Sequence, residues 1–153
     1  MSADRHDELP LDPERPLHLQ PAALGLVFAG GVAGTAARYL AEETVRPWGA
    51  WPAATFLVNV AGAFALGVLL EGLARRGPDT RGRRRWRLLL GTGFLGAFTT
   101  YSSLAVETVL LARDDRPWLA AAYSAGSVLV GLVAAAGGIR AGGQLRRVRR
   151  TAR

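Results

Sequence analysis

Hydroxyl side chains and a phenol gather in the middle of one apolar stretch, at Thr99, Thr100, Tyr101, Ser102 and Ser103. The stretch runs from about residue 88 to 112, which is long enough to cross a bilayer as a helix of roughly 20 residues. Gly91, Gly93 and Gly96 weaken such a helix through backbone entropy, and the hydroxyls compete for its backbone hydrogen bonds. Irregular backbone at membrane depth is tolerated only where protein buries it or water reaches it. We therefore expect a broken helix that faces a binding site or a pathway.

Other polar residues interrupt the neighbouring apolar segments. Thr55 and Asn59 are four residues apart, as are Tyr123 and Ser127, so each pair shares one helix face. An asparagine amide in hydrocarbon is costly unless it is hydrogen-bonded. Asn59 therefore either ties two helices together or donates to an anion, and the residues support both roles equally. Glu107 lies either near the membrane interface or among hydroxyls that hold it.

Composition excludes several kinds of chemistry. The chain has no cysteine, no lysine and only two histidines, His6 and His18, both before the first apolar segment. A cysteine or histidine metal centre and a lysine-bearing phosphate loop are therefore not expected. No soluble catalytic constellation is present, so we do not expect an enzyme. The net charge of +7 comes from arginines that flank apolar blocks, which indicates membrane topology and not nucleic-acid binding.

Four apolar blocks must position these residues. They predict spans at about 22–40, 53–73, 88–112 and 119–139. The sequence thus predicts an all-α integral membrane protein with one four-helix transmembrane domain over residues 21–140. Residues 1–20 are polar and proline-containing, and we expect a disordered cytosolic tail. Residues 141–153 are rich in arginine, and we expect a basic cytosolic tail. The 19 glycines of the chain suit close helix packing in lipid.

The first span carries two kinds of signal. Gly30 and Gly34 form a small-xxx-small face on which another helix can approach closely, and packing is the favoured interpretation. Arg38 is near the end of the span. It either extends to the interface or supplies positive potential at a vestibule, and the residues leave these two roles open.

Arginine distribution predicts the orientation. Four spans place both termini and the loop at 74–87 on one side, and 15 of the 19 arginines lie there. Only Arg38, Arg46, Arg113 and Arg116 lie on the other side. By the positive-inside rule both termini should be cytosolic in the cell membrane, in a single orientation.

Three segments together resemble the Fluc/CrcB family of fluoride channels. Residues 31–39 read GVAGTAARY, residues 55–67 read TFLVNVAGAFALG, and residues 91–103 read GTGFLGAFTTYSS. These are similar, in order and spacing, to the family's glycine-arginine start, its asparagine-bearing helix and its broken-helix signature. The resemblance extends over all four spans, from about residue 30 to 137.

The resemblance implies a dual-topology dimer, in which two four-helix subunits insert antiparallel and two fluoride pathways follow their interface. It also implies a structural sodium ion, held by backbone carbonyls at the break in the third helix. The matching positions in this chain are Gly96 and Thr99. Carbonyl oxygens released by a helix break suit a hard cation, and positive charge nearby lowers the cost of an anion.

The family's anion pathway uses aromatic ring edges and polar donors. The first of its two phenylalanines matches Tyr101 and the second matches Leu104, so this chain departs from the family at both positions. Leu104 has no ring edge. The donors carry over as Asn59, Ser102, Ser103, Tyr123 and Ser127. Thr55 and Glu107 also match polar positions of the pathway, where donors would replace the water around fluoride.

The expected function is that of a passive channel subunit that exports cytosolic fluoride. A homodimer of oppositely inserted subunits needs a chain with little charge bias, whereas this chain has a strong one. We therefore expect a heterodimer with a homologous subunit of opposite topology, which could supply the aromatic sites that Leu104 lacks. Two other classes are a small proton-coupled multidrug exporter, which would need Glu107 as its carboxylate, and a membrane scaffold, which would leave the hydroxyl cluster without a role.

Overall fold

The computed structural model describes residue 16, residues 19–75 and residues 80–151. Most of the expected N-terminal tail and part of the arginine-rich loop lie outside these residues. In chain order the helices are α1 (Pro21–Thr44), α2 (Ala53–Ala74), α3 (Arg81–Trp86), the π-helix η2 (Arg87–Leu95), α4 (Gly96–Phe98), α5 (Tyr101–Arg113) and α6 (Pro117–Thr151). Within the described residues the only strand-like pairing is an isolated bridge between Trp48 and Trp51.

Four helical segments of the described chain are long and apolar enough to cross a membrane, which confirms the predicted all-α membrane class. They are Pro21–Thr44, Ala53–Ala74, Arg81–Arg113 and Pro117–Gln144. The third segment contains α3, η2, α4 and α5. Large apolar side chains such as Phe28, Val133 and Trp118 are exposed, as expected for helices whose outer surface meets lipid.

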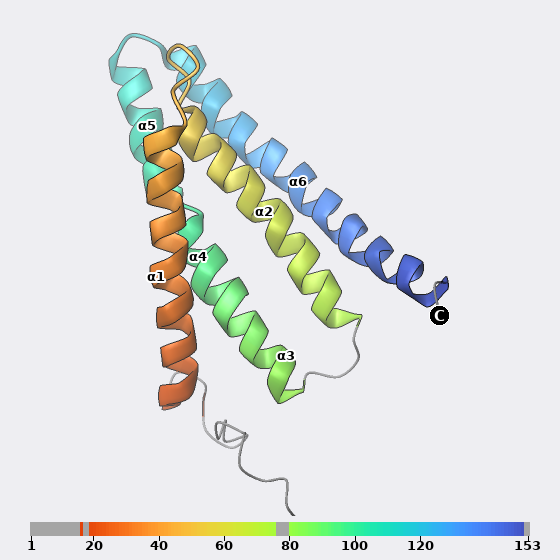
Figure 1. The fold of residues 1–153 in the computed structure, drawn as a ribbon. Coiled ribbons are helices and arrows are strands. Elements are labelled where there is room, and N and C mark those ends of the chain that lie inside the picture. Colours follow the sequence, from red (N-terminus) through yellow and green to blue (C-terminus); the bar gives the residue numbers. More distant parts are fainter. Residues whose placement is uncertain (1–15, 17–18, 76–79, 152–153) are drawn as a thin grey trace, which may run out of the picture.

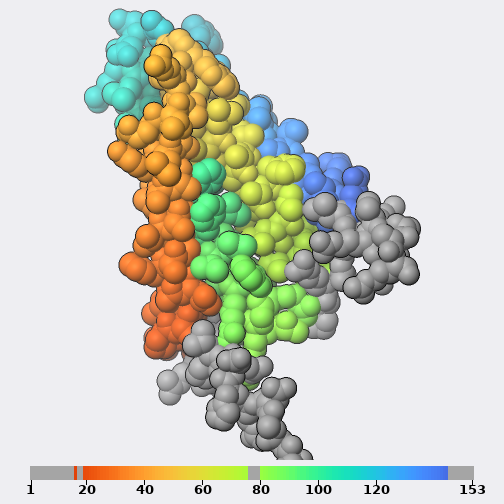
Figure 2. All heavy atoms as spheres, in the orientation of Figure 1, coloured from red at the N-terminus to blue at the C-terminus, as the bar shows by residue number. Residues whose placement is uncertain are grey.

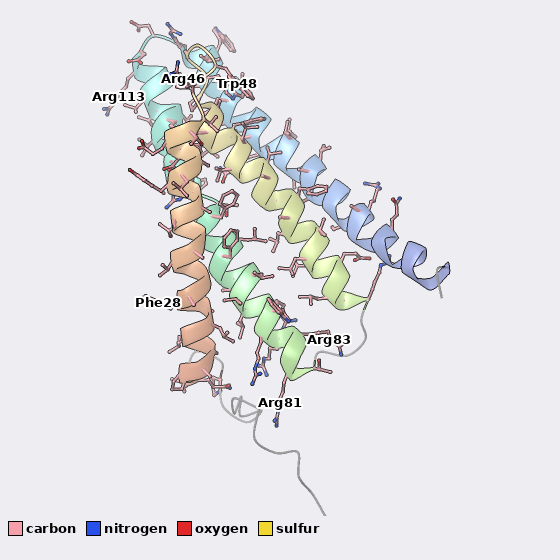
Figure 3. The ribbon with its side chains drawn as sticks, viewed as in Figure 1. Phe28, Arg46, Trp48, Arg81, Arg83 and Arg113 are labelled. Carbon is pink, nitrogen blue, oxygen red and sulfur yellow. The ribbon has the colours of Figure 1, made fainter. Side chains whose placement is uncertain are left out.

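The ends of the helices form two groups. The start of α1, the end of α2, α3 and the end of α6 lie at one end of the molecule, and the α1–α2 loop and the α5–α6 turn lie at the other (Figure 1). Arg81 and Arg83 lie at the first end, while Arg46 and Arg113 lie at the second (Figure 3). The structure thus separates the two arginine groups that the sequence assigned to opposite sides.

Proline and turn residues set the limits of the helices. Pro21 stands in the first turn of α1 and Pro117 begins α6, where a missing N–H costs no helical hydrogen bond. Between α1 and α2 the chain turns tightly at Gly49, which has a φ of 63° that suits glycine. On either side of this turn Trp48 and Trp51 exchange backbone hydrogen bonds of 3.1 and 3.0 Å.

The third membrane segment changes conformation twice. After α3 it continues as the π-helix η2 and the single turn α4. Thr99 then has a ψ of 156°, and Thr100 has a φ of −146° and a ψ of 124°, both extended. Helix α5 begins at Tyr101. Two extended residues therefore separate two helical pieces at the hydroxyl cluster.

Glycines of α1 allow it to lie against the backbone of η2, as the small-xxx-small face predicts. A Cβ added at Gly30 would come within 2.1 Å of the Leu89 carbonyl oxygen, and one at Gly34 within 2.1 Å of the Phe94 carbonyl oxygen. In Figure 2 the atoms of α1 directly adjoin the green atoms of the third segment. A glycine also allows α6 to lie against the backbone of α2, because a Cβ added at Gly138 would come within 2.1 Å of the Phe64 carbonyl oxygen.

Helix α6 is longer than its predicted span. It continues to Thr151, through much of the segment that we expected to be a basic tail. No proline follows Pro117, and residues 144–150 are Gln, Leu, Arg, Arg, Val, Arg and Arg, most of which favour helix. Helical propensity therefore carries α6 beyond the apolar block.

We predict that Gly34→Ala destabilises the protein by about 2 kcal/mol, because the new methyl group meets backbone that cannot rotate away. Gly31→Ala is the matched control, since a Cβ at Gly31 meets nothing within 4 Å. Thermal unfolding in detergent measures both. Equal melting temperatures for the two variants would show that α1 does not need this close approach.

Candidate functional site

Asn59 of α2 is bonded to the backbone of the extended segment. Its Nδ2 donates to the Thr100 carbonyl oxygen over 2.8 Å, and its Oδ1 accepts from the Thr100 N–H over 2.8 Å. One amide side chain thus satisfies both backbone groups of a residue outside the helical ladder. This is the interhelical role that the sequence left open for Asn59, and the second N–H of Nδ2 is not used by these two bonds.

The side chain of Thr100 organises the hydroxyl cluster. Its Oγ1 accepts from the Ser103 N–H over 3.1 Å, which caps the start of α5. The same oxygen lies 3.1 Å from the Ser102 hydroxyl and donates to the Ser103 hydroxyl over 3.2 Å. The cluster therefore orients Ser102 and Ser103 at the first turn of α5.

Two carbonyls, that of Gly96 at the start of α4 and that of Thr99 just after α4, lose their usual helical donors. In a continuous helix the Thr100 N–H would bond to the Gly96 carbonyl and the Ser103 N–H to the Thr99 carbonyl. Here the first N–H bonds to Asn59 and the second to the Thr100 hydroxyl. The carbonyl oxygens of Gly96 and Thr99 are therefore released from α-helical bonding, as a backbone cation site requires.

Glu107 of α5 accepts hydrogen bonds from two other helices. Its Oε1 accepts from the Thr55 hydroxyl of α2 over 2.8 Å, and its Oε2 accepts from the Tyr123 hydroxyl of α6 over 2.5 Å. Thr55 is 2% exposed and Tyr123 is fully buried. Of the positions left open for Glu107, the structure favours the one among hydroxyls. Three residues from three helices thus form one polar cluster.

A pocket of about 360 Å³ opens next to this cluster. Thr55, Ser103 and Glu107 line it together with residues of the end of α1, the following loop and the start of α2, namely Glu42, Val45, Pro47, Pro52, Ala53 and Ala54. The structure therefore brings three of the predicted pathway residues to the wall of one pocket. Its lining residues Val45, Pro47 and Pro52 belong to the α1–α2 loop, and this loop lies at the other end of the molecule from α3 (Figure 1).

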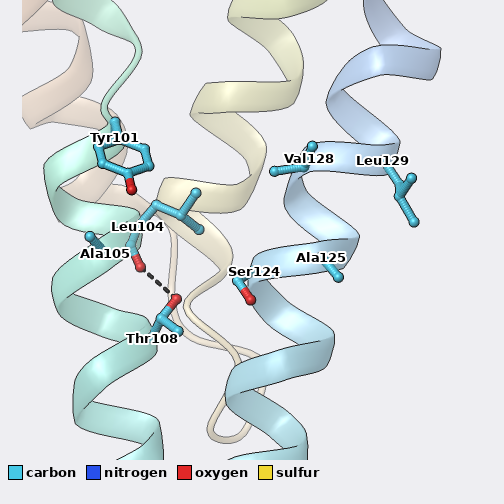
Figure 4. A pocket seen from close by; sticks show the side chains of 8 residues that line it. All are labelled: Tyr101, Leu104, Ala105, Thr108, Ser124, Ala125, Val128 and Leu129. Carbon is cyan, nitrogen blue, oxygen red and sulfur yellow. Dashed lines mark hydrogen bonds between the residues drawn. The ribbon is translucent and has the colours of Figure 1, made fainter.

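A second hollow lies between part of α5 and part of α6. It has a volume of about 690 Å³ and is lined mainly by apolar side chains, including Tyr101, Leu104, Val128 and Leu129. Figure 4 shows Tyr101 and Leu104 on α5 facing this hollow, with Ser124 on α6 across from them. Tyr101 is 82% exposed. Tyr101 and Leu104 thus line a hollow apart from the pocket beside Glu107.

The remaining predicted site residues differ in burial and in hydrogen bonding. Ser127 is buried, and its hydroxyl has no hydrogen-bond partner among the described residues. Ser127 lies one helical turn after Tyr123 on α6. Ser102 is exposed at the start of α5, and Arg38 is half-buried in α1. The structure brings neither Ser102 nor Arg38 into the cluster around Glu107.

Two contributors to this region were missed by sequence reasoning. Glu42, near the end of α1, lines the pocket with Glu107. The ring of Trp51 packs on Tyr123 at a centroid distance of 5.3 Å. Trp51 lies only four residues before Thr55, but both contacts depend on how the chain folds between α1 and α2, which no spacing pattern reveals.

Comparison with known proteins gives one consistent family. Residues 25–139 match the family described as "CrcB-like protein, Camphor Resistance (CrcB)". The chain is 45% identical over 127 residues, which are 83% of this chain and 88% of the relative, to "Fluoride-specific ion channel FluC 2" of Leifsonia xyli subsp. xyli. It is 44% identical over 119 residues, 76% of this chain and 92% of the relative, to "Fluoride-specific ion channel FluC" of Phenylobacterium zucineum.

We predict that Asn59→Ala lowers the free energy of unfolding by about 2 kcal/mol or more, because it leaves the Thr100 N–H and carbonyl without partners. The control is Thr108→Ala, which removes a hydroxyl bonded only to the Leu104 carbonyl of its own helix. Thermal unfolding in detergent compares the two. A loss no larger than that of the control would show that the amide does not hold the extended segment.

Proposed function

The chain belongs to the CrcB-like family of fluoride channels, and we propose that it is a subunit of a passive channel through which cytosolic fluoride leaves the cell. The observation that carries the proposal is the convergence of buried hydroxyl donors from α2 and α6 on Glu107 of α5. Relatives at about 45% identity are named fluoride-specific ion channels. Fluoride is small and tightly hydrated, so its path must replace water with donors.

The pathway would run along the hydrogen-bond donors of α2, α5 and α6, starting at the pocket beside Glu107. Ser103 and Thr55 border the pocket beside Glu107, and Tyr123 lies behind the carboxylate. Ser127 continues the same face of α6 one turn further and offers a buried hydroxyl. Asn59 and Ser102 would contribute at the level of the extended segment. In this arrangement an ion passes from donor to donor without entering hydrocarbon.

Glu107 would act as a placeholder for the anion. Its two oxygens accept the hydroxyl protons of Thr55 and Tyr123, which are the protons that a fluoride ion would need. A fluoride ion that reaches the cluster must therefore take these donors from the carboxylate. Sharing the donors in this way keeps them oriented between ions, because a buried hydroxyl without an acceptor is costly.

We place the second subunit on the open face of α5 and α6. Tyr101 and Leu104 line the hollow there, and the family's aromatic positions match these two residues. In a dual-topology dimer the partner would cover this face and bring its own ring edges close to the donors of this chain. Tyr101 offers an edge and a hydroxyl, whereas Leu104 offers neither. The aromatic contribution of this chain is therefore incomplete without a partner.

The helix break suits the sodium ion that the family resemblance implies. The carbonyl oxygens of Gly96 and Thr99 would hold it, since their helical donors bond elsewhere. Among the described residues no group of three or more His, Cys, Asp or Glu side chains could hold a metal, so backbone oxygens are the suitable ligands. The ion would supply positive charge at the centre of the dimer, and Arg38 would supply it nearer the vestibule.

Charge bias favours a heterodimer in the cell membrane with both termini of this chain cytosolic. The arginines of α3 and those around the α1–α2 loop lie at opposite ends of the molecule (Figure 3), and the larger group should stay in the cytosol. A second subunit of opposite bias would then insert in the other orientation. Such a partner would be homologous and would carry the aromatic residues that this chain lacks.

The two other classes fit the geometry less well. A proton-coupled exporter needs a carboxylate that releases and accepts protons in an open site, whereas both oxygens of Glu107 accept buried hydroxyl bonds. A scaffold would not need a buried hydroxyl such as that of Ser127, which bonds to no described residue. Neither class is named among the relatives reported above.

We predict that reconstituted channels release fluoride from liposomes, and that Ser127→Ala slows this release about tenfold. The reason is that one hydrogen bond to an ion contributes roughly 1.5–3 kcal/mol. A fluoride electrode measures the release, and chloride-loaded liposomes test selectivity. Stability should not fall, because the lost hydroxyl is buried and bonds to nothing in the described structure.

Ser124→Ala is the matched control for this experiment. It lies on the same helix, and its hydroxyl already donates to the Ala120 carbonyl over 3.0 Å, so its loss should slow release far less. Equal rates for Ser127→Ala and the unmodified chain would remove Ser127 from the pathway. No fluoride release from well-folded protein, alone or with a partner, would contradict the channel itself.

We predict that this chain inserts in one orientation and conducts only with a subunit of opposite bias. The chain has no cysteine, so Thr80→Cys and Thr44→Cys place single probes at the two ends of the molecule. An impermeant thiol reagent added outside cells should label Thr44→Cys and not Thr80→Cys. Equal labelling of both, together with fluoride release from the chain alone, would instead establish a homodimer.

A further inference from the structure

Trp51 is the aromatic residue that joins the α1–α2 loop to the polar cluster. The turn at Gly49 folds the loop back, and paired backbone hydrogen bonds hold Trp51 opposite Trp48. The indole of Trp51 then meets Tyr123 edge to face, with ring centroids 5.3 Å apart and planes at 89°. A loop outside the helices is thus in contact with a buried side chain of α6.

The surroundings of Trp51 hold it firmly in this position. Phe56 of α2 packs against it at a centroid distance of 5.6 Å and an angle of 79°. Its outer edge lies over Gly126, where an added Cβ would be 3.6 Å from Cη2. At this distance an added Cβ would be in ordinary van der Waals contact, so the indole lies against α6 at Gly126 as well as at Tyr123. Edge-to-face packing of this kind favours one ring orientation over others.

We propose that Trp51 is a positioning residue for the anion pathway, which sets the Tyr123 ring so that its hydroxyl points at the Glu107 site. The inference rests on the proposed channel function and extends it to a residue outside the polar cluster. Tyr123 turns about two side-chain torsions. Rotation about χ2 turns the ring about the axis that carries the hydroxyl and leaves the oxygen in place, whereas a change in χ1 swings the whole ring and moves the hydroxyl away from Oε2 of Glu107. The indole of Trp51, packed on the ring at 5.3 Å, restricts that swing.

A purely structural role for Trp51 would have different consequences. Plain packing would lower stability by the same amount whether or not the Tyr123 hydroxyl is present. Positioning would act only through that hydroxyl, so its effect on fluoride release would vanish when the hydroxyl is removed. The double-mutant comparison separates the two roles, because residues that act as a unit are not additive.

The experiment measures fluoride release from liposomes per assembled channel, with assembly checked by gel filtration. Trp51→Leu keeps an apolar side chain but loses the aromatic edge, and we expect release to slow about fivefold, in line with the strength of an edge-to-face pair. Trp51→Phe keeps an edge and should retain most of the rate. In a Tyr123→Phe background, Trp51→Leu should cause no further slowing.

The control is Trp48→Leu, from the same turn. Trp48 packs on Phe56 with centroids 6.5 Å apart and should leave the release rate within twofold of the parent. Further slowing by Trp51→Leu in the Tyr123→Phe background would overturn the proposal, as would equal losses in Trp51→Phe and Trp51→Leu. The second result would assign the effect to the buried indole N–H, which has no partner among the described residues. If the unmodified protein releases no fluoride either alone or with a subunit of opposite bias, the channel function fails, and the proposal for Trp51, which rests on it, fails too.

Discussion

The structure depends on satisfying backbone polar groups at a place where the third membrane segment is not helical. Water cannot solvate such groups in hydrocarbon, so protein must do so. Asn59 bonds to both backbone groups of Thr100, and the Thr100 side chain caps the next helix. A single amide on α2 therefore permits the extended segment. The released carbonyls of Gly96 and Thr99 and the start of α5 at Tyr101 accompany this pairing.

Close contact between backbones makes the pairing possible. Gly62 of α2 allows the Thr99 side chain to lie where a Cβ would otherwise be, at 2.2 Å. Gly30 and Gly34 allow α1 to lie directly on the carbonyls of η2. Without a hydrophobic drive between helices in lipid, such contacts supply much of the association. Packing by glycine and bonding by asparagine thus act together, since Asn59 reaches Thr100 only because α2 lies so near.

Sequence reasoning could predict whatever depends on local pattern. Apolar length gave the four spans, and spacing placed Tyr123 and Ser127 on one face of α6. It could not identify the partners of Asn59 and Glu107, because Thr100 and Tyr123 reach them through tertiary packing. The aromatic contact of Trp51 and the extension of α6 to Thr151 were also missed. The first depends on a turn outside the helices, and the second on helical propensity that continues beyond the apolar block.

The length of α6 has a mechanical consequence. At 1.5 Å per residue, its 35 residues extend about 50 Å, whereas the hydrocarbon layer is about 30 Å thick. Roughly two fifths of the helix, about 20 Å, therefore exceeds the thickness of the hydrocarbon and forms a stalk that is continuous with the turns that carry Tyr123 and Ser127. A bulky domain attached to the stalk would stand clear of the lipid surface, while a torque applied there would be transmitted along α6 to the polar cluster.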